Sequence, residues 1–192
     1  MKDYSLQQRA DFYNNAFPKR VKVFVDKGWI VGSWSIGNCY KNDSSLYGSY
    51  PHSYLERILS MFPDAERILY LFSGSLQNVK GVRFDIDPKK KPDVVGDAHF
   101  LSKYFEPDEF DMILSDCPYS AEDALHYGTP MIKRNIVVKE CMKVLEPGGW
   151  LNWLDQVLPM YSNKIIKRRG EIGLTQSTNH RVRETFMFER LG

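Results

Sequence analysis

The sequence predicts an α/β protein built on a largely parallel sheet. Apolar runs of strand length recur along the chain and alternate with segments of helical periodicity, as in parallel strands joined by helices. The first complete run, residues 68–72, is apolar throughout, which suits a strand covered on both faces. The last two strand candidates leave little room for a crossover helix between them, so we expect them to pair antiparallel.

Composition narrows the class of protein. The chain has 192 residues, 43% hydrophobic and 26% charged, with a net charge of +2, values typical of one folded domain over residues 1–192. Neither an apolar run of the ~20 residues that span a bilayer nor a secretion signal is present, so we expect a cytoplasmic protein with no membrane partner. The three cysteines form no Cys-x-x-Cys pair and the four histidines lack ligand spacing, so no metal site is expected.

The front of the chain, residues 1–52, has the pattern of an irregular lead-in. It holds two strand-like pieces broken by glycines, residues 21–25 and 28–34, followed by a loop-like stretch rich in glycine, serine, asparagine and tyrosine. The aromatic stretch at residues 47–52 fits two interpretations. It is either a lid over a site or an ordinary turn with buried tyrosines.

The α/β core is expected over residues 53–192. A capping-box pattern at Ser53 and Glu56 predicts its first helix, which Pro63 ends. Strands are predicted at residues 68–72, 81–86, 94–95, 111–115, 150–154, 164–174 and 183–191. Between the fourth and fifth of these, a long helix is predicted to start with Thr129 as its cap and Pro130 as its first residue. A Glu-Pro-Gly-Gly sequence follows and predicts the end of that helix.

Candidate ligand-binding turns follow each of the first four core strands. Residues 72–75 contain a glycine, and Asp85, Asp97 and Asp116 follow the next three strands. Ligands of open α/β sheets bind beyond the carboxyl ends of the strands. A glycine there admits a ligand close to the backbone, and a carboxylate can accept both hydroxyls of a ribose or an exocyclic amine. Each turn alone is as compatible with a plain loop or helix cap, but their order together predicts a site.

These turns, with Leu145-Glu146-Pro147-Gly148-Gly149-Trp150, resemble class I S-adenosylmethionine-dependent methyltransferases. Asp116-Cys117-Pro118-Tyr119 is similar to the Asp-Pro-Pro-Tyr signature of enzymes that methylate amines of adenine or cytosine in nucleic acids, with cysteine where proline is usual. The likeness covers roughly residues 53–191 and extends to small phage and bacterial DNA-modification methylases. It implies a Rossmann-like, mostly parallel, seven-stranded sheet with the last strand inserted antiparallel.

The resemblance also implies S-adenosyl-L-methionine as cofactor and assigns roles to single residues. The main chain and side chains expected to bind the cofactor are those of Phe72, Ser73, Gly74, Asp85, Ile86, Asp97 and Ala98. Within this set, the first three would line the methionine part, Asp85 would bind the ribose, and Asp97 would bind the adenine amine. Only about ten residues separate Gly74 from Asp85, fewer than a crossover helix needs, so a loop or single turn is expected there.

The tetrapeptide has a physical rationale of its own. An exocyclic amine is conjugated with its ring, so its nitrogen lone pair is poorly nucleophilic. Asp116 and the carbonyl of Cys117 can accept hydrogen bonds from its two N–H groups. These two bonds favour a pyramidal nitrogen whose lone pair points at the methyl group. Pro118 restrains Cys117 to an extended conformation, and Tyr119 offers a ring on which a base can stack.

The sequence therefore predicts a methyltransferase whose partner is a nucleic acid, with adenine N6 in DNA first and cytosine N4 or an RNA base as alternatives. Because no separate recognition domain is found, a partner protein is a candidate source of target recognition. Three competing interpretations stay open at this point. They are a non-catalytic S-adenosylmethionine-binding protein, a nicotinamide-dependent oxidoreductase, and a methylase of ring carbons that uses Cys117 as nucleophile.

Overall fold

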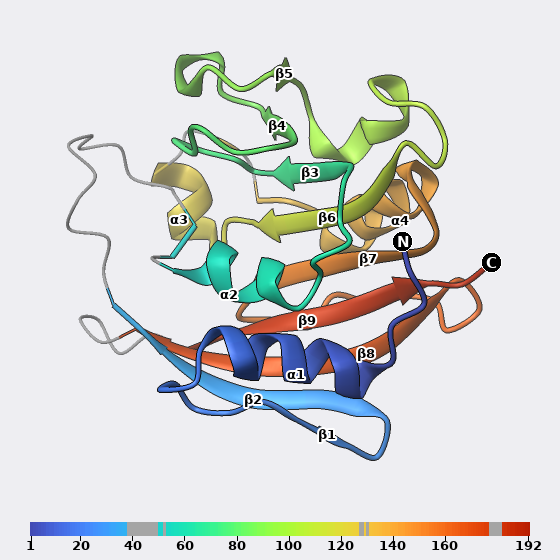
Figure 1. The fold of residues 1–192 in the computed structure, drawn as a ribbon. Helices are drawn as coiled ribbons and strands as arrows, with labels where there is room; N and C mark the ends of the chain where they lie inside the picture. The colour runs from blue at the N-terminus through green and yellow to red at the C-terminus, as the bar shows by residue number, and fades with distance from the viewer. Residues whose placement is uncertain (38–49, 52, 127–128, 130, 177–181) are drawn as a thin grey trace.

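The computed structural model describes residues 1–37, 50–51, 53–126, 129, 131–176 and 182–192. Within them, one sheet has the strand order β1-β2-β8-β9-β7-β6-β3-β4-β5 (Figure 1). The strands are β1 (Phe24–Asp26), β2 (Trp29–Ile36), β3 (Ile68–Leu71), β4 (Val82–Asp85), β5 (Val94–Val95), β6 (Phe110–Asp116), β7 (Leu145–Asp155), β8 (Ile166–Gln176) and β9 (Val182–Arg190). The helices are α1 (Leu6–Ala16), α2 (Tyr54–Ser60), α3 (Ala121–His126), α4 (Arg134–Val144) and the 3₁₀ helices η1 (Pro88–Lys90) and η2 (Ala98–Lys103).

The sheet confirms the predicted α/β fold class and its strand directions. Strands β5, β4, β3, β6 and β7 run parallel to one another. The last strand, β9, is inserted between β7 and β8 and is antiparallel to both, as the Rossmann-like methyltransferase fold implies. The described part of the sheet has nine strands, however, so the expected number of seven is wrong. The two extra strands, β1 and β2, extend the sheet beyond β8.

The prediction for residues 1–52 is correct for its two strand-like pieces, which form β1 and β2. The expectation that this segment is an irregular lead-in is wrong for the described residues, because they join the main sheet. Strand β2 pairs in parallel with β8 from Ile30 to Ile36, and α1 precedes the two added strands. Helix α1 begins at a complete capping box, in which Ser5 and Gln8 exchange side-chain and backbone hydrogen bonds. Arg9 lies on the buried side of α1, so the apolar periodicity that would have revealed this helix is interrupted.

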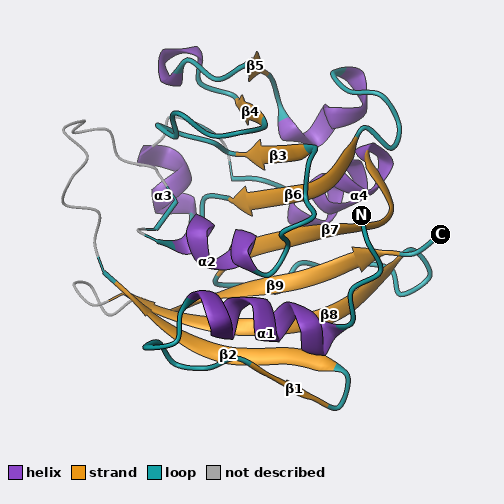
Figure 2. Cartoon of the chain, in the orientation of Figure 1, coloured by secondary structure: helices purple, strands orange, loops and turns teal. Residues whose placement is uncertain are grey.

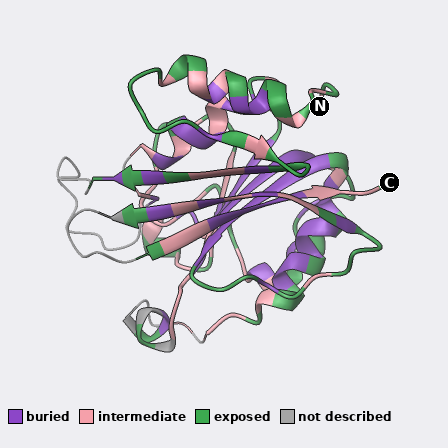
Figure 3. Ribbon diagram, turned by 90° about the horizontal axis from the view of Figure 1, so that it is seen from below, coloured by how far each residue is buried: buried purple, intermediate pink, exposed green. Residues whose placement is uncertain are grey.

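Helices cover both faces of the sheet (Figure 2). One apolar core lies between the sheet and α1 with α2, where Tyr13, Ile58 and Met112 are fully buried. The other lies between the sheet and α4 with η2, where Val137 and Leu101 are fully buried. Buried residues accordingly fill the space between the sheet and the helices (Figure 3). The edges where strands end carry the loops.

The structure corrects one predicted capping box and one predicted helix start. Ser53 does precede α2, but it has a left-handed backbone (φ 59°) and its side chain makes no capping hydrogen bond, so the capping box does not form. Helix α4 begins at Arg134, after Lys133, rather than at Pro130, which lies outside the described residues. Thr129 instead bonds back to the carbonyl of Ala124 through its backbone N–H at 2.9 Å. Neither Ser53 nor Thr129 thus caps a helix with its side chain as predicted.

The connection from β3 to β4 contains no helix, as its length predicted. The parallel registers bring the carboxyl ends of β3, β4, β6 and β7 to one edge of the sheet, which we call the carboxyl edge. The carboxyl ends of β2 and β8 and the start of β9 lie at this edge too. None of the described helices is long and apolar enough to cross a membrane.

Candidate active site

The turn after β3 is held in a strained conformation by the end of β4. Phe72 and Gly74 both have positive φ angles, 58° and 53°, and glycine is the residue that adopts this region without steric cost. The backbone N–H of Gly74 donates to Oδ2 of Asp85 at 2.8 Å, and the N–H of Asp87 donates to Oδ1 at 2.9 Å. Asp85 therefore fixes the turns after β3 and β4 together.

Asp97 is linked to a distant segment through a histidine. Its Oδ1 accepts from the backbone N–H of His99 at 2.9 Å and lies 2.6 Å from Nδ1 of the same residue. Nε2 of His99 accepts from the backbone N–H of Lys133 at 2.9 Å, so the proton of the neutral ring is on Nδ1. This chain connects the turn after β5 to the start of α4. Beside it, Ala98 is buried, whereas Ile86 after β4 is 43% exposed.

The tetrapeptide follows β6 at the carboxyl edge. The hydroxyl of Tyr119 donates to Oδ1 of Asp116. The guanidinium of Arg183, at the start of β9, lies 4.3 Å from the centre of the Tyr119 ring, so one face of that ring is covered by a cation. Burial and the charge of Asp116 raise the pKa of Tyr119 well above its ordinary value, so its hydroxyl keeps its proton. A stacked base would use the other face of this ring.

Asp155, the last residue of β7, holds the tetrapeptide in place through hydrogen bonds. Its carboxylate is fully buried and accepts from Nε and Nη2 of Arg134 at 2.6 and 3.1 Å and from Nε1 of Trp153 at 3.0 Å. Arg134 in turn donates from Nη2 to the carbonyl of Tyr119 at 3.0 Å. The thiol of Cys117 also donates to Asp155, at 3.1 Å. One buried acid therefore positions both ends of the segment from Cys117 to Tyr119.

Tyr50 joins the ends of β3 and β6. Its hydroxyl lies 3.0 Å from the carbonyl oxygen of Leu71 and 2.8 Å from that of Leu114, and its ring stacks on Tyr54. Burial raises the pKa of Tyr50 well above its ordinary value, and the charges of Asp116 and Asp85 raise it further. The carboxylates of Asp85 and Asp116 are therefore both near enough to Tyr50 to disfavour loss of its proton. Of the proposed lid, only Tyr50 and Pro51 are described, and Tyr50 is a buried tyrosine of the kind that the turn interpretation expects.

Several polar groups at the carboxyl edge are free to form hydrogen bonds with a polar cofactor. The hydroxyls of Ser73 and Ser75, in the turn after β3, and of Ser115, near the end of β6, are buried without a hydrogen-bond partner in the described structure. Buried polar groups are ordinarily paired, so unpaired ones beside a glycine turn are consistent with a ligand. Asp85 uses one acceptor position on each oxygen for the backbone and has lone pairs left for ribose hydroxyls.

Cys117 has the properties of a structural residue rather than a nucleophile. It is 1% exposed, and burial beside Asp155 raises the pKa of its thiol well above the ordinary value. The thiolate, which is the reactive form, is therefore disfavoured at neutral pH. The interpretation as a methylase of ring carbons that attacks through Cys117 loses its support.

We expect Cys117→Ala to keep methyl transfer within a few-fold of the parent protein, because the backbone carbonyl at this position is unchanged. Losing the thiol hydrogen bond should cost only about 0.5–1.5 kcal/mol of stability, because Asp155 keeps Arg134 and Trp153 as donors. Transfer assays on the variant and peptide mass spectrometry after iodoacetamide treatment check both expectations. Loss of all transfer with the fold intact, or rapid alkylation of Cys117 in the native protein, would restore the nucleophile interpretation.

Sequence reasoning missed three partners of the tetrapeptide: Arg134, Asp155 and Arg183. Asp155 carried a usable signal, because it follows a predicted strand just as Asp85, Asp97 and Asp116 do. Arg134 and Arg183 carried none, since their roles depend on where two other elements end. Among the described residues, no group of three or more metal-ligating side chains is found.

No protein-family model and no curated protein matches the chain. Among solved structures, TrmN from Thermus thermophilus is 18% identical with a TM-score of 0.48, over 66% of this chain and 44% of TrmN. An rRNA methylase from Streptococcus thermophilus is 12% identical with a TM-score of 0.41, over 66% of this chain and 88% of that protein. The fibrillarin pre-rRNA processing protein of Methanococcus jannaschii is 16% identical with a TM-score of 0.41, over 66% and 67%. These are partial likenesses of fold, and the fold described above rests on the strand order of this chain.

Proposed function

We propose that this protein transfers a methyl group from S-adenosyl-L-methionine to an exocyclic amine of a nucleic-acid base. The proposal rests on one observation. The acidic turn after β4 and the tetrapeptide after β6 lie at the same edge of the sheet, on the two sides of β3. Asp85 and Asp116 follow the two strands that pair with β3, and both charges act on Tyr50 between them. A donor bound at the first turn would lie beside an amine held at the second.

The cofactor part of the proposal assigns each turn a task. Ser73 and Gly74 would bind the amino-acid end, Asp85 the ribose, and Asp97 with Ala98 the adenine, with the exposed side chain of Ile86 available to cover a flat ring. When bound, the cofactor supplies a methyl group already activated on a positive sulfonium. The residues of the chain therefore need only bind and orient the two reactants, without covalent chemistry of their own.

The acceptor part rests on two hydrogen-bond acceptors at the start of the tetrapeptide. Asp116 and the Cys117 carbonyl would accept the two N–H groups of the amine, which aims the nitrogen lone pair. The donation from Tyr119 orients the Asp116 carboxylate, and the link from Arg134 to the Tyr119 carbonyl holds the segment in place. Burial raises the pKa of Tyr119, so this donation persists through neutral pH.

Adenine N6 in DNA is the target that the tetrapeptide favours first, and cytosine N4 or an RNA base is the second candidate. All of these targets present an amine on a flat ring, and stacking on the face of Tyr119 opposite Arg183 would suit each of them. In a duplex, the base would have to leave the helix stack before reaching Asp116. Recognition of the target would come from loops at the carboxyl edge, from the N-terminal extension (residues 1–37, with α1, β1 and β2) or from a partner protein.

The test is cofactor binding followed by transfer. Calorimetry measures binding of S-adenosylmethionine, and tritium from labelled cofactor is then followed into single- and double-stranded DNA and into RNA. The proposal expects both binding and incorporation. Binding without incorporation into any substrate would favour a non-catalytic cofactor-binding protein, and selective binding of a nicotinamide dinucleotide would favour an oxidoreductase.

Asp85→Ala should weaken cofactor binding before it affects anything else. It removes the acceptor of the Gly74 and Asp87 N–H groups and the expected ribose ligand at once. We expect the Kd to rise roughly 10- to 100-fold, the equivalent of about 1.5–3 kcal/mol for a charged hydrogen bond. The matched control is Asp93→Ala, which removes an exposed acid paired with Arg83. Equal Kd values for Asp85→Ala and the control would remove Asp85 from the cofactor site.

A further inference from the structure

A cationic pocket lies in the N-terminal extension, outside the residues assigned above. It is a partly open cavity of about 150 Å³ between the loop after α1, the second half of β2 and α2. Three cations line it, Lys19, Arg20 and Arg57, with the polar side chains of Ser33 and Ser35. No carboxylate is among its lining residues. Such a set of donors suits an anion.

Arg57 is the unusual member of this pocket. It is only 3% exposed, yet it has no ion pair with any described carboxylate, and its Nε lacks a hydrogen-bond partner there. Among the described residues, its Nη2 donates a hydrogen bond to the carbonyl of Ser35 at 3.3 Å, and its guanidinium lies 5.7 Å from the centre of the Trp34 ring. Burial lowers the pKa of Arg57, and the charge of Arg20 lowers it further, against the opposing effects of Tyr13 and Glu56.

A buried, unpaired cation is costly unless something compensates it. The compensating group must carry negative charge and accept several hydrogen bonds, since Arg57 offers Nε–H and the neighbouring serines offer hydroxyls. A phosphate has both properties, and a guanidinium binds it with a planar fork of donors. The two exposed cations, Lys19 and Arg20, stand where the pocket meets solvent, so the anion would enter from the surface.

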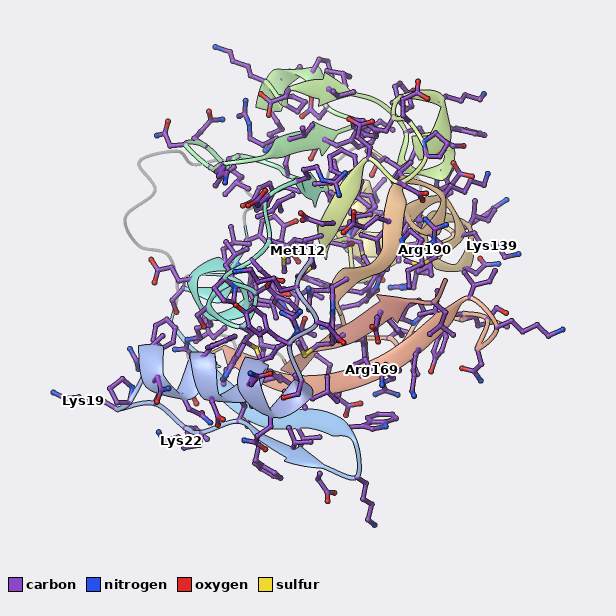
Figure 4. The ribbon with its side chains drawn as sticks, turned by 45° about the vertical axis from the view of Figure 1, so that its right-hand side comes forward. Lys19, Lys22, Met112, Lys139, Arg169 and Arg190 are labelled. Atoms are coloured by element: carbon purple, nitrogen blue, oxygen red, sulfur yellow. The ribbon has the colours of Figure 1, made fainter. Side chains whose placement is uncertain are left out.

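The position of the pocket relates it to the proposed site. Ser35 pairs with Thr175 near the end of β8, and β8 adjoins β9, whose Arg183 covers Tyr119. The pocket therefore lies towards the carboxyl edge. Strands β8, β9 and β7 separate β2 from β6, which ends in the tetrapeptide, so the two are four strand spacings apart. Four spacings amount to about 19 Å, a distance that a short single strand of nucleic acid can span at about 3.4 Å per phosphate. Figure 4 shows Lys19 extending outward just beyond α1, with Lys139 on the opposite side of the molecule.

We infer that this pocket binds a backbone phosphate of the nucleic-acid substrate and that the N-terminal extension is its substrate-positioning element. The identity of the occupant rests on the proposed function, whereas the anion-binding character of the pocket does not. The extension thus supplies a contact that lies outside the seven strands of the core. This contact would recognise the charge of the nucleic acid rather than its base sequence, because phosphates are the same at every position.

The experiment compares binding of a fluorescein-labelled, 12-nucleotide single-stranded DNA by anisotropy across a salt series, without cofactor. The Lys19→Ala/Arg20→Ala variant changes two exposed residues and leaves the core intact. We expect its affinity to fall about tenfold at low salt and its slope of log affinity against log salt to lose about 0.7 for each phosphate contact removed. The control, Lys164→Ala/Lys167→Ala, removes two exposed lysines at the opposite edge of the sheet and should match the parent protein.

The outcomes separate this inference from the proposed function. Weakened binding by the pocket variant alone supports the pocket, even if no methyl transfer is found in any assay. Parental affinity and salt slope in the pocket variant would overturn the inference, even if the protein methylates DNA. A further measurement adds inorganic phosphate to the parent protein and to Arg57→Gln during thermal unfolding. Stabilisation of the parent protein alone, together with unchanged DNA binding in the double variant, would contradict a backbone phosphate and indicate a free anion as the ligand.

Discussion

Asp116→Ala is expected to abolish methyl transfer while leaving the affinity for S-adenosylmethionine near that of the parent protein. The substitution removes the acceptor proposed for the target amine and the partner of the Tyr119 hydroxyl. We expect kcat to fall by a factor on the order of 10²–10³, as when one positioned hydrogen-bonding group is removed from an active site. Calorimetry with the cofactor and tritium transfer to DNA and RNA measure the two effects separately.

A matched control for this variant lies on the same strand. Asp111→Ala removes a buried acid at the amino end of β6, where its carboxylate accepts the backbone N–H groups of Glu66 and Arg67 at 3.0 and 3.1 Å. This variant should lose stability but keep kcat at temperatures where it is folded. Transfer at the parental rate by Asp116→Ala, or an equal loss of kcat in Asp111→Ala, would show that the role assigned to Asp116 is wrong.

Asp155→Ala is expected to cost the most stability of any variant considered. It leaves the guanidinium of Arg134 without its buried partner and deprives the Trp153 N–H and the Cys117 thiol of their acceptor. Breaking a buried pair by removal of one partner costs about 3–5 kcal/mol. For a chain of this length, that loss should lower the unfolding midpoint by on the order of 10 °C.

Asp155 is a positioning residue, so its effect on transfer should exceed what instability alone produces. Arg134 links it to the carbonyl of Tyr119, and loss of that link should reduce kcat and leave the affinity for cofactor unchanged in the folded variant. Asp111→Ala again provides the comparison, since it removes a buried acid remote from the tetrapeptide. If both variants kept the parental kcat below their unfolding midpoints, the network under the tetrapeptide would be structural only.

The core of the fold could be predicted because its elements carry local signals. The run at residues 68–72 is apolar without alternation and forms a fully buried central strand, β3. The short gap between β8 and β9 forced an antiparallel pair. The position of the acids at strand ends followed from the rule for open α/β sheets, which places Asp85 and Asp116 on either side of β3.

The N-terminal extension could not be predicted in the same way. Strand β2 had the pattern of a strand, but nothing local indicated that it joins the main sheet, because its partner β8 lies more than a hundred residues later in the chain. Helix α1 buries Arg9 beside Phe62, with the guanidinium 4.7 Å from the ring centre, so a charged residue occupies a core position. These pairings depend on long-range contacts that no local pattern encodes.

The supporting contacts of the site were hidden for a related reason. Arg134 is the first residue of a helix whose start was expected four residues earlier, so its distance from Asp155 could not be foreseen. Arg183 contacts the Tyr119 ring from the start of β9, a strand that follows the tetrapeptide by more than sixty residues. The tetrapeptide is a local motif, but the groups that hold it come from three other elements.

Mass spectrometry of nucleosides recovered after incubation of DNA and RNA with the protein and isotopically labelled S-adenosylmethionine is the most direct measurement. If Asp116 and the Cys117 carbonyl bind the amine as proposed, the label is expected on an exocyclic nitrogen, with N6-methyldeoxyadenosine as the leading product. A label found only on a ring carbon or a sugar oxygen would contradict this account.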